Sequence, residues 1–114
     1  MMKEVTIILK SPPSTSKFSE ALRIAVAMIG MDMMPNILFC YDGVYCLLIE
    51  EISAKEYDEH LRSVADLAGI HVLSNSMEER RLTPSDLDKT LATKIISLEE
   101  ASQLISKSSL VFAL

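Results

Sequence analysis

The chain has little glycine and no long apolar run. It has only three glycines among its 114 residues, and none forms a GxGxxG run or a phosphate-binding loop. Because such loops need glycine for backbone amides to approach a phosphate, we do not expect a glycine-cradled nucleotide site. No window approaches the ~20 apolar residues of a membrane helix, and the N-terminus enters an expected strand without a signal peptide. We therefore expect a cytoplasmic protein without membrane contact.

Cysteine and basic residues are also scarce. Cys40 and Cys46 are the only cysteines. They lack the spacing of a disulfide framework, which fits a reducing compartment, and the CxxC spacing of redox and zinc sites. The net charge of -5 leaves no basic stripe for nucleic-acid phosphates. These absences predict no metal, no cofactor and no nucleic-acid partner.

What the chain does contain is a regular alternation of short aliphatic runs and amphipathic stretches. We expect strands at residues 5–9, 36–41, 70–73, 94–97 and 110–114. We expect helices at residues 18–29, 44–50, 54–67, 97–106 and, shorter, from Ser74 or Asn75 to Arg80 or Arg81 and again after Thr83. Such an alternation predicts an α/β fold with a parallel sheet covered on both faces and right-handed crossovers. The length and the 49% apolar fraction predict one domain over residues 1–114.

The stretch from residue 37 to residue 46 is the most informative. Asp42 and Gly43 interrupt a buried strand, and ligands in open α/β sheets gather where strands end and helices begin. Cys46 falls in the first turn of the expected helix after Asp42, where backbone amides favour a reactive thiolate. Packing as a small buried hydrophobe is the commoner outcome for a lone cysteine, and more so for Cys40 inside its strand.

Hydroxyl and amide side chains gather at two expected helix starts on the same sheet edge. Helix-start amides together with hydroxyl groups could hold an anion, although helix capping explains these residue types equally well. The candidate binding residues are Ser14, Thr15, Ser16, Asp42, Ser74, Asn75 and Ser76. Arg80 or Arg81 could reach an anionic ligand. We assign no catalytic role to the two histidines, and we expect His60 to be solvated and His71 to face outward.

Several of these segments resemble the DsrE/DsrF family, which includes the TusC and TusD subunits of the bacterial sulfur relay. The resemblance lies in the order of elements over essentially the whole chain. It is carried by a first strand leading into a long loop and helix, by Asp42-Gly43-Val44-Tyr45, by residues 70–82 and by residues 98–114. It implies a three-layer α/β/α sandwich with a mostly parallel five-stranded sheet. It also implies a homo-oligomer, often a trimer or hexamer, or a hetero-oligomer with related DsrE-like subunits.

Active members of the family carry sulfur as a persulfide on a cysteine after the third strand. The matching segment here, residues 73–76, reads Leu-Ser-Asn-Ser. A serine hydroxyl cannot carry sulfane sulfur, so the chain resembles the DsrF/TusC branch of partner subunits that lack this cysteine. Met33 and Met34 beside Pro35 are candidates for a subunit contact. Methionine side chains are common on adaptable contact surfaces, and we prefer this interpretation to copper binding.

Three interpretations follow. The first is a noncatalytic or regulatory subunit of a sulfur-relay assembly. The second is a sulfurtransferase or persulfide carrier acting through Cys46, or failing that through Cys40. The third is a small oligomeric protein that binds an anionic metabolite or nucleotide at the hydroxyl-rich edge.

Overall fold

The fold is built on five parallel strands in the order β4-β3-β2-β1-β5. The computed structural model describes residues 3–48, 58–67 and 69–114. The strands are β1 (Glu4–Leu9), β2 (Met34–Phe39), β3 (Gly69–Leu73), β4 (Lys94–Ile96) and β5 (Leu110–Ala113). The apolar, β-branched character of β1 to β3 fits strands whose two faces are both covered. The predicted α/β class and the five strands are confirmed.

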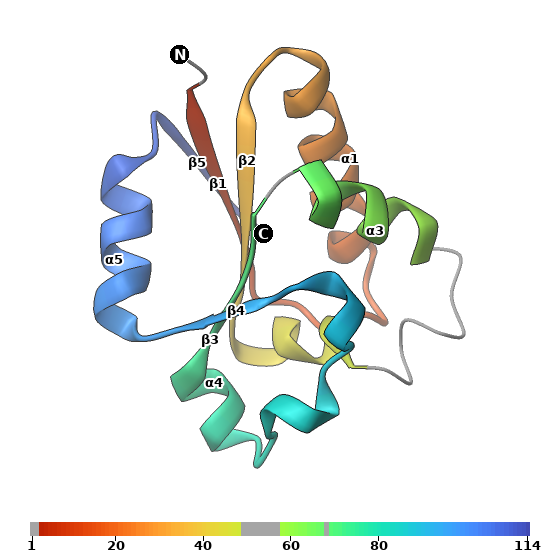
Figure 1. The fold of residues 1–114 in the computed structure, drawn as a ribbon, viewed down its shortest axis with the longest axis vertical. Coiled ribbons are helices and arrows are strands. Elements are labelled where there is room, and N and C mark those ends of the chain that lie inside the picture. Colours follow the sequence, from red (N-terminus) through yellow and green to blue (C-terminus); the bar gives the residue numbers. More distant parts are fainter. Residues whose placement is uncertain (1–2, 49–57, 68) are drawn as a thin grey trace.

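Helices cover the two faces of the sheet unequally (Figure 1). On one face α1 (Ser16–Gly30) and α3 (Asp58–Leu67) enclose the larger core, which includes Ile7, Phe18, Phe39 and Val64. On the other face α5 (Leu98–Lys107) covers a smaller cluster built on Leu38, Cys40, Leu73, Ile96 and Ala101. The predicted three-layer arrangement is therefore present, with its thinner layer at α5.

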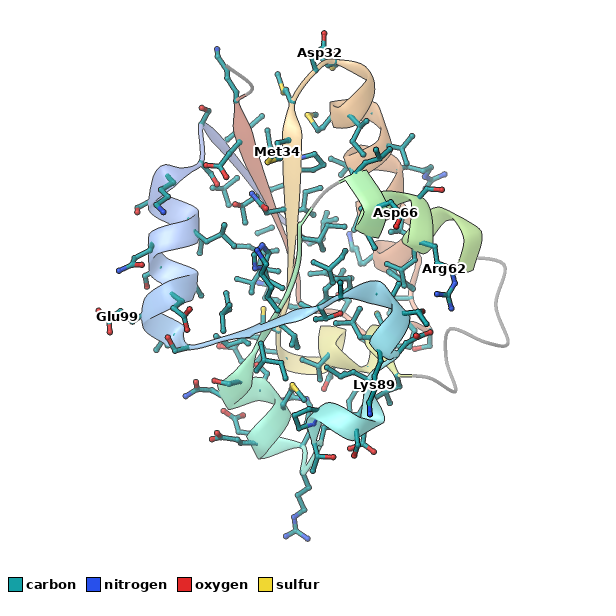
Figure 2. All side chains as sticks on the ribbon, in the orientation of Figure 1. Asp32, Met34, Arg62, Asp66, Lys89 and Glu99 are labelled. Carbon is teal, nitrogen blue, oxygen red and sulfur yellow. The ribbon has the colours of Figure 1, made fainter. Side chains whose placement is uncertain are left out.

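Short helices follow β2 and β3 and lead from β3 to β4. They are η1 (Tyr41–Leu47), α4 (Ser74–Glu79), η2 (Pro84–Asp86) and η3 (Lys89–Leu91). None of the helices described is both long and apolar enough to cross a bilayer. Figure 2 shows charged side chains such as Asp32 and Glu99 pointing away from the body of the molecule, as expected for hydrated groups.

The boundaries of two short helices differ from prediction. The helix expected at residues 44–50 is a 3-10 helix that begins at Tyr41, and Cys40 rather than Asp42 precedes it. Likewise, Leu73 precedes α4, so neither Ser74 nor Asn75 caps it. Residues 49–57, which contain the end of the first expected helix and the start of the helix expected at 54–67, lie outside the described residues.

A polar pair lies beneath α5, where the sequence suggested an outward-facing histidine. His71 is only 8% exposed, so the expectation that it faces outward is wrong. Its Nε2 lies 3.4 Å from Asn36 Oδ1 on the neighbouring strand. A Cβ on Gly69 would overlap the Asn36 carboxamide and lie 2.8 Å from His71 Nε2, so glycine makes room for the pair. Burial, and then the charge of Lys94, lower the pKa of His71, which therefore packs as a neutral ring.

Candidate functional site

Three neighbouring strands deliver polar residues to one edge of the sheet. β1, β2 and β3 are adjacent and parallel, so their carboxyl ends share this edge. There the chain presents Lys10 after β1, Cys40 to Asp42 after β2, and Ser74 to Ser76 after β3. Carboxyl ends of parallel strands are where α/β folds place ligands and chemistry, which makes this edge the candidate site.

The turn after β2 is strained and is held by a serine from α4. Tyr41 has φ 50°, a left-handed conformation that is uncommon for a residue with a side chain. Its backbone N–H donates to Ser76 Oγ at 2.8 Å, and Ser76 is buried. The hydroxyl predicted to bind an anion therefore accepts an internal hydrogen bond and fixes the turn at Tyr41.

Arg80 ties the same two elements together by charge. Its Nε donates to Asp42 Oδ1 at 3.1 Å, and its Nη1 donates to the Ser76 carbonyl oxygen at 3.2 Å. The Arg80 side chain is 17% exposed, whereas Asp42 is 55% exposed. The guanidinium, predicted to reach an external anion, thus serves an internal carboxylate and a helix carbonyl.

Cys40 lies at the end of β2, under the α5 layer. It is 4% exposed, and its Sγ donates to the Leu9 carbonyl oxygen at 3.9 Å. Burial raises the pKa of the Cys40 thiol, and the nearby positive charges of Lys10 and Arg80 oppose that rise without cancelling it. A thiol in this state is protonated at neutral pH and is a weak nucleophile.

Cys46 occupies a different place from the one its sequence position suggested. It is the penultimate residue of η1, not a residue of a first helical turn, so the helix-start argument for its reactivity is wrong. It is fully buried in the core on the α1 side, and its Sγ donates to the Ser11 carbonyl oxygen at 3.8 Å. The catalytic assignment of either cysteine stays a prediction.

The remaining hydroxyl residues divide between two separate hydrogen-bonded groups. Thr15 Oγ1 donates to the Pro12 carbonyl oxygen at 3.0 Å, and the Ser16 carbonyl accepts from Ser19 Oγ. Ser74 Oγ lies 3.5 Å from Asn75 Oδ1. These hydrogen bonds of Thr15 and Ser16 thus stay within the loop before α1 and α1 itself, whereas Asp42 and Ser76 are joined through Arg80. The exposed Ser14 stays a binding prediction.

Two features of this edge were missed from the sequence. One is the left-handed backbone of Tyr41. The sequence did not indicate it, because glycine, asparagine or aspartate is the usual residue in this conformation. The other is Lys10, whose charge acts on Cys40. A signal for Lys10 existed, because it is the first charged residue after an aliphatic strand in a parallel sheet.

Comparisons with known proteins agree on the fold. The profile of the DsrE/DsrF-like family matches residues 3–113. The crystal structure of the ychN protein from E. coli aligns with a TM-score of 0.78 at 17% identity over 100% of both chains. The protein of unknown function MTH1491 from Methanobacterium thermoautotrophicum aligns with a TM-score of 0.75 at 12% identity, again over 100% of both chains. No curated protein matches the chain.

Proposed function

The chain belongs to the DsrE/DsrF-like family, and we propose that it is a noncatalytic or regulatory subunit of a sulfur-relay-type assembly. The resemblance to this family implies transfer of sulfur as a cysteine persulfide between subunits. In that setting, a subunit without an accessible thiol contributes surface and structure rather than sulfur carriage. We further propose that it acts as an oligomer, with copies of itself or with related DsrE-like subunits.

The observation that carries the proposal is the chemistry at the start of α4. Residues 73–76 supply leucine, serine, asparagine and serine where active family members place the sulfur-bearing cysteine. Ser76 there is buried and accepts the Tyr41 amide instead of facing a substrate. Both cysteines of the chain are buried, and the pKa of Cys40 is raised. A thiolate able to attack a donor persulfide is therefore disfavoured at neutral pH.

Persulfide loading tests the proposal directly. The native protein is incubated with a low-molecular-weight persulfide at neutral pH and its intact mass is recorded. We expect no gain of one sulfur atom. An Asn75→Cys variant is the matched control, because Asn75 is exposed at the start of α4 and a thiol there should take up sulfur. Loading of the native protein as fast as the variant would overturn the noncatalytic role.

A second candidate function is sulfur transfer through Cys40. It is favoured by the two cations, Lys10 and Arg80, that lower the pKa of this thiol against the effect of burial. In such a step the Cys40 thiolate would attack the sulfane sulfur of a persulfide, form Cys–S–SH and release the donor as its thiol. A sulfur gain lost in Cys40→Ser but kept in Cys46→Ser would support this role. The reverse pattern would favour Cys46.

A further inference from the structure

The last strand of the sheet is an unprotected edge. Among the described residues β5 pairs with β1 alone and ends the strand order on that side. The Leu114 N–H donates to the Ile8 carbonyl oxygen at 2.8 Å, and the Leu114 carbonyl oxygen accepts from the Lys10 N–H at 3.0 Å. Since alternate residues of a strand direct their backbone groups to opposite sides, Leu110 and Phe112 also face β1, and the N–H and C=O groups of Val111 and Ala113 point away from it. They offer a ready ladder to another strand.

Neither helical layer covers β5. Leu110 is 46% exposed, and Val111, which faces the α5 side, is 40% exposed. Phe112 is half-buried and Ala113 is exposed. The strand is thus open along its outer edge and largely open on both faces, and its side chains are aliphatic or aromatic.

The opposite edge of the sheet is built differently. β4 has only three residues and begins with an exposed lysine, Lys94. A short edge strand that carries lysine is a usual protection against strand pairing. By contrast, no charged or proline residue occurs between Ser108 and Leu114. The two edges therefore differ in just the features that block or permit addition of a strand.

We propose that β5 pairs antiparallel with β5 of a second copy across a two-fold axis, which joins the two sheets into one. In the register with Val111 opposite its own symmetry mate, Leu110 of one copy meets Phe112 of the other. The outward-facing N–H and C=O groups of Val111 in each copy then bond to the C=O and N–H groups of Val111 in the other, as a hydrogen-bonded antiparallel pair requires. The Leu110–Phe112 contacts form on the α1 side of the sheet, and the two Val111 side chains meet on the α5 side.

A second copy, rather than an unrelated chain, is favoured by charge and by self-complementarity. A two-fold contact sets each residue against itself or a near neighbour, so a charged strand would meet its own charge. The chain carries a net charge of -5, which makes self-association costly except at an uncharged strip such as β5. This inference deepens the assembly part of the proposed function and does not depend on sulfur transfer.

Light scattering coupled to size-exclusion chromatography tests the contact, with a matched pair of lysine variants. Val111→Lys places two like charges at the two-fold axis. Ile95→Lys makes the same change at 41% exposure on the opposite edge strand. We expect the native protein and Ile95→Lys to form dimers or larger even-numbered assemblies at about 50 μM. In Val111→Lys the dissociation constant should rise by about tenfold or more, with the circular-dichroism spectrum unchanged.

Three outcomes would overturn the proposal: a monomeric native protein, equal assembly of the two variants, or a closed trimer that survives Val111→Lys. Hydrogen exchange of the native protein keeps the test open if that variant does not fold. Amides within residues 108–114 should become more protected as protein concentration rises, whereas β4 amides should not. Persulfide loading is measured separately, so failure of the β5 contact is distinguishable from failure of the noncatalytic role.

Discussion

At the scale of the single residue, Gly43 is the glycine at which an added Cβ would collide with another backbone segment. A Cβ at this site would overlap the Leu9 carbonyl oxygen and lie 2.9 Å from the Leu9 carbonyl carbon, both of them backbone atoms. The same oxygen accepts the Cys40 N–H at 3.0 Å, so it cannot withdraw without loss of that bond. Gly43→Ala should therefore reduce the free energy of unfolding by about 2 kcal/mol or more, measured by urea denaturation.

Gly30 supplies the control for this prediction. It ends α1, and a Cβ there meets no heavy atom within 4 Å. Gly30→Ala should be neutral or stabilising by about 0.5 kcal/mol, because alanine restricts the unfolded chain more than glycine does. Equal stability of the two variants would show that the approach of Gly43 to Leu9 is looser than described.

Individual residues also show where sequence reasoning succeeded and where it could not. The pattern Asp42-Gly43 correctly indicated a break after an aliphatic strand, but β2 ends at Phe39, two residues before the predicted end at Tyr41. The burial of His71 could not be predicted from alternation, because both faces of this sheet are covered and neither face is outward. The position of Cys46 was also predicted wrongly. It depends on the close approach of Gly43 to the Leu9 backbone, which shapes η1 and joins residues far apart in sequence.

At the scale of the element, the hydrogen bond from Tyr41 N–H to Ser76 Oγ joins η1 to α4 and should contribute measurably to stability. Ser76→Ala leaves the amide of a strained residue without its partner. We expect the free energy of unfolding to fall by about 1–2 kcal/mol by urea denaturation. Ser74→Ala, at the first residue of α4, should change it by less than about 0.5 kcal/mol.

If Ser76→Ala and Ser74→Ala cost the same, the Tyr41 turn does not depend on α4. Replacement by threonine is a second check, since Ser76→Thr keeps the hydroxyl group. It should recover part of the loss in spite of its added methyl group in a buried site.

Helix α5 shows which element boundaries can be predicted from sequence. The helix was predicted to begin at Ser97, and in the structure Ser97 is the residue that caps it: Ser97 Oγ accepts from the Glu100 N–H at 3.1 Å while Glu100 Oε1 accepts from the Ser97 N–H at 3.0 Å. This reciprocal cap is local, so a stretch of four residues suffices to predict it. By contrast, neither Ser74 nor Asn75 caps α4, because this helix begins at Ser74 directly after β3 and its capping position falls on Leu73.

At the scale of the whole molecule, the alternation of strands and helices in the sequence was enough to predict the order of elements and the parallel sheet. Right-handed crossovers and burial on both faces restrict the topologies available to such a sequence. The unequal thickness of the two helical layers could not be predicted from the sequence. Among the described residues α5 is the one long helix on its face of the sheet, and there Ala101 is buried while Leu104 and Ile105 are only half-buried.

The buried histidine and two stabilised carboxylates together predict how stability responds to acid. The pKa of His71 is lowered from 6.5, mainly by burial. Burial alone would raise the pKa of Asp88, but hydrogen bonds from Thr90 and the charge of Arg62 hold it below 3.8. Backbone and side-chain hydrogen bonds at Ser97 lower the pKa of Glu100 from 4.5. All three shifts make the unfolded chain bind protons more readily than the folded chain as pH falls.

Stability should therefore decline in two stages below neutral pH. The His71 contribution is fully present above pH 6.5 and is lost as pH falls from there toward the lower folded pKa. The carboxylate contributions are present above the unfolded values of 4.5 and 3.8 and are lost as pH falls through the folded ones. Urea denaturation in a His60→Gln background leaves His71 as the one titrating histidine. Adding His71→Gln should abolish the first stage and spare the second, and persistence of the first stage would show that another group causes it.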